Sequence, residues 1–542
     1  MTTPTMSHWP AHALTPLLAT TVGGVLRAAA WRAPDRVALI DGDRRWTYGE
    51  LRDEAERVAR GLLTRFTPGE PVAVWAGNSA DWVLLEFAAG LAGLTLVTVN
   101  PAYQAEELAH VLGHSGARGV FLRGGAQAAI LAGVRDRLPR LREVITLGEW
   151  PSDEGGPLPD VDPAGPAQIL YTSGTTGRPK AAVLTHRGLT NNARLAAEAI
   201  GLRAGDVLVN PMPYFHVAGC GLITLGLVQT LGTQVVLPRF DPGWMLELIE
   251  RYRGTVIGGV PTMLTALLAA AARASRDLSS LRMALAGGAS VPPELVRQVE
   301  AEFGVPFTLT FGQTESSCSI TMTRPSDRAD DRAETLGRPL PQTAVKITDV
   351  ATGATVPCGT VGEICTRGYL VMDGYLGDPE ATLAAIDADG WLRTGDLGSM
   401  DERGYCRIAG RIKEMIIRGG ENIYPREIEA VLASHPAVAE AVVVGVPDRF
   451  WGEVVGAVVR PAFDVTEAGL ADYCRGRLAA YKTPVRWMFT GAFPLTPTGK
   501  IRKDVLSAQL AEVVLAEAGL ADVGLAESGF AEVGKVPSSV TL

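Results

Sequence analysis

The side chains best suited to chemistry are densest in one ten-residue segment, Tyr171-Thr-Ser-Gly-Thr-Thr-Gly-Arg-Pro-Lys180. Its glycines let backbone N–H groups approach an anion, its hydroxyls donate hydrogen bonds, and Lys180 supplies a compact positive charge. This composition predicts phosphate binding, although on composition alone an ordinary Ser/Thr/Gly-rich hairpin stays open. The candidate phosphate ligands are Thr172, Ser173, Gly174, Thr175, Thr176, Gly177 and Lys180.

The spacing differs from the common nucleotide loop G-x-x-x-x-G-K-[ST], which opens a helix, because Lys180 follows Pro179. The flanking segments 167–171 and 181–185 are apolar and predicted to be extended, so we expect the loop to join two strands.

Four more residues downstream could take part in chemistry. They are His216 in Pro-Tyr-Phe-His, Glu315 in Thr-Phe-Gly-Gln-Thr-Glu, Asp396 in Trp-Leu-Arg-Thr-Gly-Asp, and Lys500 in Pro-Leu-Thr-Pro-Thr-Gly-Lys. Each has an ordinary structural explanation when taken alone: a core histidine, a solvated acid, a turn-capping aspartate and a surface lysine.

The surrounding pattern predicts an α/β fold with several structural units. From residue 22 to about 166, and again after Lys180, amphipathic helices alternate with short apolar runs, which is typical of doubly wound βαβ subdomains. Shorter strands and frequent turns near Gly337 indicate a small β-rich subdomain. We expect a large domain over 1–409, a hinge at 410–413, a small mobile α+β domain over 414–506, and a loosely ordered acidic tail over 507–542.

Composition excludes several classes of function. The 542 residues carry 50 Lys plus Arg against 59 Asp plus Glu, a formal charge of −9, so no nucleic-acid surface is expected. We predict no membrane span, because the longest early apolar stretch is short and interrupted. The six cysteines lack C-x-x-C spacing, and no Lys or Arg precedes Arg27; both favour a cytoplasmic protein. A five-residue repeat over 515–534 has no predicted function.

In this order and spacing, the motifs before the tail resemble those of the adenylate-forming superfamily of acyl-CoA synthetases, non-ribosomal adenylation domains and luciferases. The resemblance implies that the Tyr171–Lys180 loop holds ATP phosphates, Glu315 holds Mg²⁺, and Asp396 accepts hydrogen bonds from both ribose hydroxyls. It also implies an adenine site at Gly288, Ala289, Ser290, Phe311, Gly312 and Gln313, with Thr314 contacting phosphate. Phe311 replaces the family's usual Tyr and Ser290 its frequent Pro; stacking on adenine survives the loss of a hydroxyl.

The resemblance further implies a mobile C-terminal part. Arg411 is expected near the ribose and phosphates, Lys413 at the hinge, and Gly419 and Gly420 in the segment that swings in for thioester formation. Lys500 would reach the substrate carboxylate and the α-phosphate. A cation there offsets repulsion of about 4 kcal/mol between two unit charges at about 4 Å.

The implied reaction activates a carboxylic acid with ATP and Mg²⁺, releases pyrophosphate, and passes the acyl group to coenzyme A, with Lys500, His216 and Glu315 as catalytic residues. In the family, the position of His216 lines or gates the carboxylate pocket. Enzymes for α-amino acids typically carry an aspartate in that pocket for the substrate ammonium, and His216 cannot supply its full negative charge, so we expect an aromatic or medium-to-long aliphatic acid instead. Three alternatives remain: transfer to a nitrogen nucleophile or carrier protein, a luciferase-type oxidation, and an inactive nucleotide-binding protein.

Overall fold

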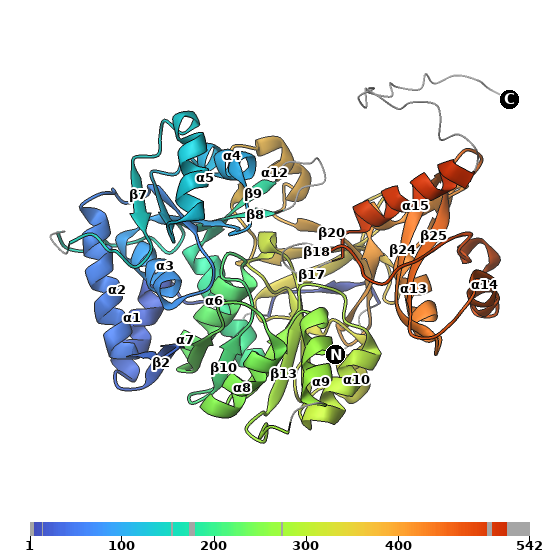
Figure 1. Cartoon of the computed structure of the whole chain (residues 1–542), viewed down its shortest axis with the longest axis horizontal. Coiled ribbons are helices and arrows are strands. Elements are labelled where there is room, and N and C mark those ends of the chain that lie inside the picture. Colours follow the sequence, from blue (N-terminus) through green and yellow to red (C-terminus); the bar gives the residue numbers. More distant parts are fainter. Residues whose placement is uncertain are drawn as a thin grey trace. The chain divides into compact units, whose positions relative to one another are not determined.

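The computed structural model describes residues 5–12, 15–152, 156–172, 179–272, 275–495 and 501–517. These residues divide into two compact units, a large unit that runs to Lys413 and a small unit that begins at Glu414. The boundary falls at the end of the segment suggested as a hinge. Mixed α/β sheets in both units confirm the predicted fold class (Figure 1).

The first sheet of the large unit has the order β19-β9-β8-β5-β4-β6-β7. Strands β4 to β8 pair in parallel, and β9 and β19 add antiparallel pairs at one edge. The strands are β4 (Pro71–Trp75), β5 (Thr95–Val99), β6 (Gly119–Leu122), β7 (Glu143–Thr146), β8 (Pro166–Thr172), β9 (Lys180–Thr185) and β19 (Gly374–Tyr375). The helices around them are α1 (Val22–Arg32), α2 (Tyr48–Leu63), α3 (Ala80–Ala92), α4 (Ala105–Ser115), α5 (Ala126–Val134), η1 (Arg135–Arg137) and α12 (Pro379–Ala385).

Local sequence explains why these elements form. Helix α2 begins with a capping box in which Thr47 and Glu50 bond each other's backbone N–H groups. Helix α3 is buried along its whole length and ends at Gly93, whose φ of 67° lies in the left-handed region that favours glycine. A helix with no polar face must lie inside the fold. Helix α3 accordingly packs against α1, α2 and β5 in the core.

The second sheet has the order β16-β15-β14-β13-β12-β10-β11-β2-β3, with β10 to β14 parallel. The strands are β2 (Val37–Asp41), β3 (Arg44–Thr47), β10 (Val207–Asn210), β11 (Thr233–Val236), β12 (Val256–Gly259), β13 (Met283–Gly287), β14 (Phe307–Phe311), β15 (Thr321–Met322) and β16 (Arg338–Pro339). The helices are α6 (His186–Ala199), the π-helix η2 (Ala218–Thr224), α7 (Leu225–Thr230), α8 (Pro242–Tyr252), α9 (Pro261–Ala271), α10 (Pro293–Phe303), η3 (Thr314–Ser316) and α11 (Ala329–Glu334). Figure 1 shows α8, α9 and α10 gathered beside β13.

The chain between β11 and β13 forms α8, β12 and α9. Strand β12 ends in two glycines, which weaken a strand signal. A Cβ on Gly258 would lie 2.7 Å from the Leu285 carbonyl oxygen, so the glycine allows β12 and β13 to approach closely.

The third sheet is antiparallel and matches the predicted β-rich subdomain. Its strands are β1 (His8–Trp9), β17 (Thr343–Thr348), β18 (Gly362–Gly368), β20 (Leu392–Met400) and β21 (Cys406–Arg411). The η4 turn (Ile412–Glu414) follows β21 and contains the boundary between the units.

The small unit packs helices against a mixed sheet of the order β23-β22-β25-β24, with β26 paired to β25. Its elements are β22 (Ile416–Arg418), β23 (Glu421–Ile423), α13 (Pro425–Ala433), β24 (Val438–Asp448), β25 (Gly452–Pro461), α14 (Glu467–Arg475), η5 (Ala480–Lys482), β26 (Arg486–Phe489) and α15 (Lys503–Glu517). Helix α15 continues past residue 506, where we expected the domain to end, and Leu510 is buried. The repeat from residue 518 onward lies outside the described residues.

Candidate active site

The predicted phosphate loop begins and ends in one hairpin. Strands β8 and β9 pair antiparallel with Thr172 directly opposite Lys180, which confirms that the loop joins two strands. Residues 173–178, and with them Ser173, Gly174, Thr175, Thr176 and Gly177, lie outside the described residues. The hairpin therefore fixes the two ends of the loop side by side.

Glu315 lies beside this hairpin base. It belongs to η3 and is only 9% exposed. Its Oε1 accepts hydrogen bonds from the Tyr375 hydroxyl at 2.8 Å and the Thr172 hydroxyl at 3.4 Å. The Lys180 ammonium stands 4.9 Å from the centre of the Tyr375 ring. The fold thus brings together Thr172, Lys180 and Glu315, as the motifs predicted.

Tyr375 is a member of this cluster that sequence reasoning missed. A tyrosine in a turn-rich segment has no chemical signature of its own. Its position follows from the pairing of β19 with β9, in which Tyr375 lies opposite Ala182.

Glu315 also fits the oxygen chemistry of Mg²⁺. Both of its hydrogen bonds within the described residues go to Oε1, which leaves Oε2 able to face a cation. Mg²⁺ in proteins typically takes one or two carboxylates and completes its shell with phosphate oxygens and water. The described residues contain no cluster of three or more His, Cys, Asp or Glu side chains that could hold a metal by themselves.

Asp396 and Arg411 form a second charged pair on adjacent strands. They are register partners on β20 and β21, and Arg411 Nε lies 2.9 Å from Asp396 Oδ1. The Asp396 side chain is 6% exposed, whereas that of Arg411 is 59% exposed. Upstream, Glu363 is buried; it accepts hydrogen bonds from Arg393 and from the backbone N–H of Gly395. This second contact holds the turn that presents Asp396.

Lys413 belongs to the same electrostatic environment. Partial burial, followed by the positive charges of Lys180 and Arg411, lowers the pKa of Lys413, while Glu315 acts in the opposite direction. The positive charges of Lys180 and Arg411 thus lie close enough to Lys413 to disfavour its charged form. The large unit therefore gathers Lys180, Arg411 and Lys413 near Glu315.

The predicted adenine residues lie at the carboxyl ends of two neighbouring parallel strands. Gly287 on β13 is the register partner of Thr310 on β14, so the turn at Gly288, Ala289 and Ser290 and the segment Phe311, Gly312, Gln313 and Thr314 leave the same sheet edge. Ligands of open α/β sheets bind at such edges. Gly288 has φ 76°, and a Cβ on Gly312 would lie 2.1 Å from the Cys318 carbonyl oxygen, so both positions favour glycine.

His216 is half-buried in the loop before η2. Its Nδ1 accepts a hydrogen bond from the Ala218 backbone N–H at 3.2 Å. A nitrogen that accepts carries no proton, so in the neutral ring the proton is on Nε2. The loop itself is fixed by Asn78, which accepts from the Tyr214 N–H, and by Thr98, which donates to the Phe215 carbonyl.

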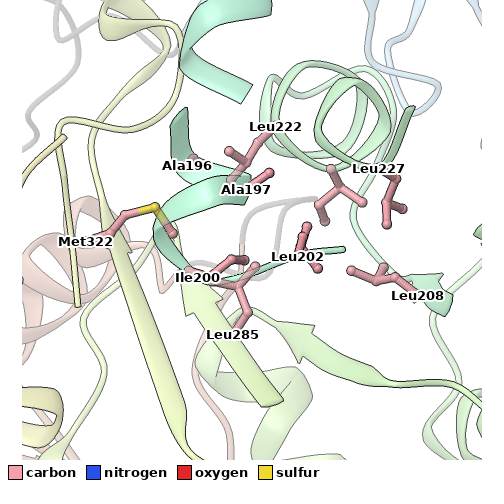
Figure 2. A pocket seen from close by; sticks show the side chains of 10 residues that line it. Ala196, Ala197, Ile200, Leu202, Leu208, Leu222, Leu227, Leu285 and Met322 are labelled. Atoms are coloured by element: carbon pink, nitrogen blue, oxygen red, sulfur yellow. The ribbon is translucent and has the colours of Figure 1, made fainter. Parts of the chain in front are cut away.

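An apolar cavity lies behind η2. Figure 2 shows its lining side chains, which come from α6, β10, η2, α7, β13 and β15 and include no polar group. They are Ala196, Ala197, Ile200, Leu202, Leu208, Leu222, Ile223, Leu227, Leu285 and Met322. Gly219 and Cys220, which also belong to η2, are buried, and neither lines this cavity.

In the small unit, Gly419 and Gly420 form the turn between β22 and β23, with φ of 58° and 91°. The Trp451 ring packs on Gly419, where a Cβ would lie 2.7 Å from a ring carbon. Lys500 lies outside the described residues, but Leu495 and Ile501 on either side of its segment form a β-bridge. Among the described helices, none is long and apolar enough to cross a membrane.

Comparison with known proteins identifies the family. The family described as AMP-binding enzyme matches residues 26–376, and its C-terminal domain matches residues 427–500. The chain is 39% identical to YngI of Bacillus subtilis (strain 168), which is named provisionally as an acyl-CoA synthetase; the match covers 92% of this chain and 98% of that one. It is 35% identical to the mitochondrial medium-chain acyl-CoA ligase ACSF2 of Rattus norvegicus, over 94% of this chain and 90% of that one.

Solved structures agree with the sequence matches. The ATP-bound crystal structure of MatB from Rhodopseudomonas palustris superposes with a TM-score of 0.84 at 29% identity, covering 91% of this chain and all of that one. With both family domains matched and the nucleotide motifs gathered in the large unit, the chain belongs to the AMP-binding enzyme family of the adenylate-forming superfamily.

Proposed function

We propose that this enzyme activates a carboxylic acid with ATP and transfers the acyl group to coenzyme A, as an AMP-forming acyl-CoA ligase. A carboxylate oxygen attacks the α-phosphorus and pyrophosphate leaves; the thiol of coenzyme A then attacks the acyl carbon, and AMP leaves. The observation that carries the proposal is the convergence of Lys180, Glu315 and Lys413 in the large unit, next to the Asp396–Arg411 pair.

The nucleotide would be held by groups from several elements. Asp396 accepts from the two ribose hydroxyls, while Phe311 and the turn at 288–290 bracket the adenine. The loop residues and Lys180 bind the β- and γ-phosphates, and Thr314 donates to a phosphate oxygen. Glu315 would hold Mg²⁺, which when bound neutralises charge on the phosphates.

The second half-reaction requires a different arrangement of the small unit. We propose that the small unit rotates about Lys413 after adenylation, withdrawing Lys500 and bringing the Gly419–Gly420 turn toward the acceptor. Movements of this kind absorb their backbone change at a few terminal residues of elements. The boundary between Lys413 and Glu414 supports this placement of the hinge.

Lys500→Ala tests whether Lys500 acts in adenylation but not in thioester formation. Adenylation should fall about 10²- to 10³-fold, as when one preorganised donor is lost, whereas thioester formation from supplied acyl-adenylate should be largely retained. The two half-reactions are measured by pyrophosphate release and by acyl-CoA formation. Lys482→Ala, which removes a small-unit lysine paired to Glu427, is the control. Equal losses in both half-reactions would refute the role of Lys500.

The substrate class we propose is an unbranched aliphatic acid of medium length. The side chains around the small cavity behind η2 are wholly apolar (Figure 2), which suits an alkyl chain better than an aromatic ring with polar substituents. The cavity has room for about one water molecule, so an acyl chain would have to push these side chains apart. The ACSF2 relatives are named for medium-chain acids. His216 would lie on the carboxylate side of the pocket. A panel of linear and aromatic acids, each offered with coenzyme A or an amine, tests both substrate and acceptor by product analysis.

We also place the protein in a reducing compartment, the cytoplasm. All six cysteines lie within the described residues, and no disulfide joins any of them there. Scattered thiols of this kind are typical of reducing compartments.

A further inference from the structure

A hydroxyl and an aromatic ring on one residue, Tyr375, connect the two charged groups predicted to act on the ATP phosphates. The hydroxyl donates to Glu315 Oε1 at 2.8 Å, and the ring faces the Lys180 ammonium at 4.9 Å. We propose that Tyr375 is a positioning residue for ATP and Mg²⁺: it orients the Glu315 carboxylate and keeps it from pairing directly with Lys180. This inference rests on the proposed function and assigns a new residue to it.

The backbone around Tyr375 is built to hold the ring in place. Its N–H donates to Thr382 Oγ1 at 2.9 Å, and the next residue, Leu376, donates to the Ala181 carbonyl at 2.8 Å. Earlier in the same segment, the Met372 N–H donates to the Glu315 carbonyl at 2.9 Å. The strap 372–376 is therefore bonded to η3 at one end and to β9 at the other.

Strand register explains how the ring reaches Lys180. Tyr375 lies opposite Ala182, so Lys180 is the diagonal neighbour two residues away on β9. Diagonal neighbours on paired strands are within reach of aromatic and long side chains. An ammonium over a ring face is attracted by the ring's negative face, and this attraction fixes a side chain that would otherwise be mobile.

The contacts of Tyr375 leave the charges of Lys180 and Glu315 unneutralised by each other. No ion pair within 4 Å joins Lys180 to Glu315 in the part of the chain that the structure describes. Had the two groups paired, each would have to give up its partner before binding phosphate or Mg²⁺. Since Tyr375 satisfies both with a neutral side chain, the ammonium and the second carboxylate oxygen remain able to bind their ligands.

Two variants separate the hydroxyl from the ring. Tyr375→Phe keeps the ring over Lys180 and removes only the bond to Glu315. Tyr375→Leu removes both contacts and allows Lys180 and Glu315 to approach each other. Tyr252→Phe is the matched control, because it deletes a tyrosine hydroxyl bonded to the Gly42 carbonyl elsewhere in the large unit.

The measurement is ATP affinity by titration calorimetry on the full chain without acid substrate, with Mg²⁺ and with chelator. For Tyr375→Phe we expect about tenfold weaker binding with Mg²⁺, the loss of one hydrogen bond to a charged group, and unchanged binding without Mg²⁺. Tyr375→Leu should weaken binding under both conditions. Tyr252→Phe should bind as the wild type does.

A double-mutant cycle with Glu315→Gln distinguishes positioning from general structural damage. If Tyr375 acts through the carboxylate, adding Tyr375→Phe to Glu315→Gln should change Mg²⁺-dependent affinity less than twofold. The inference is overturned if Tyr375→Phe keeps the wild-type response to Mg²⁺, or if it weakens binding equally with and without the metal. If the wild type itself binds no ATP, the proposed function fails first and this inference falls with it.

Discussion

The nucleotide side of the large unit and the cavity behind η2 are neighbours built from different chemistry. On β13, Leu285 lines the cavity, while Gly287 leads directly into the turn predicted to hold adenine. The nucleotide side consists of charged and polar groups with hydrogen-bond or ion-pair partners, whereas the cavity is lined by apolar side chains alone. A phosphate or ribose is recognised by particular atoms, but an alkyl chain is recognised by volume.

The largest loss of ligand affinity is expected from a substitution on the nucleotide side. Asp396→Ala removes the proposed acceptor of both ribose hydroxyls and leaves the Arg411 guanidinium without this carboxylate. We expect ATP to bind about 100-fold more weakly, a loss of about 3 kcal/mol for two charge-assisted hydrogen bonds. Calorimetry measures it, with Asp43→Ala, a fully exposed aspartate, as the control. Affinity within threefold of wild type would contradict the ribose assignment.

Helix α6 belongs to both sides, since it starts directly after β9 and its last turns line the cavity. His186, its first residue, is 1% exposed, and Nδ1 accepts from the Val22 N–H. Burial lowers the pKa of His186 to about 4, against an opposing effect of Asp162. Below pH 6.5, His186 therefore binds a proton in the unfolded chain but not in the folded chain. As a result, the free energy of unfolding falls as the pH drops toward 4.

That loss should reach about 3 kcal/mol, from the difference of the two pKa values. His186→Asn retains an acceptor without titrating near neutrality. In urea unfolding between pH 7 and pH 4, the stability of the wild type relative to His186→Asn should decrease by this amount. Parallel pH profiles of the two proteins would show that His186 is protonated in the folded state.

On the cavity side, smaller effects are expected. Ala196→Leu adds volume to the lining, so it should exclude the end of a longer chain. With about 0.8 kcal/mol per buried methylene, losing room for two of them lowers kcat/KM for the longest accepted acid about tenfold. Shorter acids serve as internal controls and should react as before. A uniform loss across all chain lengths would argue that the cavity does not hold the acyl chain.

The two sides also differ in how far sequence could predict them. Glu315, Asp396 and Lys180 were found from motifs, because phosphate, metal and ribose each require particular residue types within short segments. Tyr375 was missed because its role depends on a strand pairing between distant parts of the chain. The cavity was missed because its volume is set by six elements that come together only in the fold. The structure brings Glu315, Lys180 and Thr172 together, but the ligand assigned to each of these residues, as to Asp396, Lys500 and the loop centre, remains a prediction.

The π-helix η2 gives the cavity side a property that side-chain substitutions cannot change. Its wide turn is seen in the bond from the Leu222 N–H to the Val217 carbonyl, five residues back. A π-turn amounts to an α-helix with one inserted residue. Because the wide turn absorbs the extra residue, deleting one residue there would restore α-helical spacing while the helix beyond it keeps its register. The deletion would change which side chains of the turn, Leu222 and Ile223 among them, line the cavity. A one-codon deletion in η2 would therefore reshape the cavity and leave the nucleotide motifs intact.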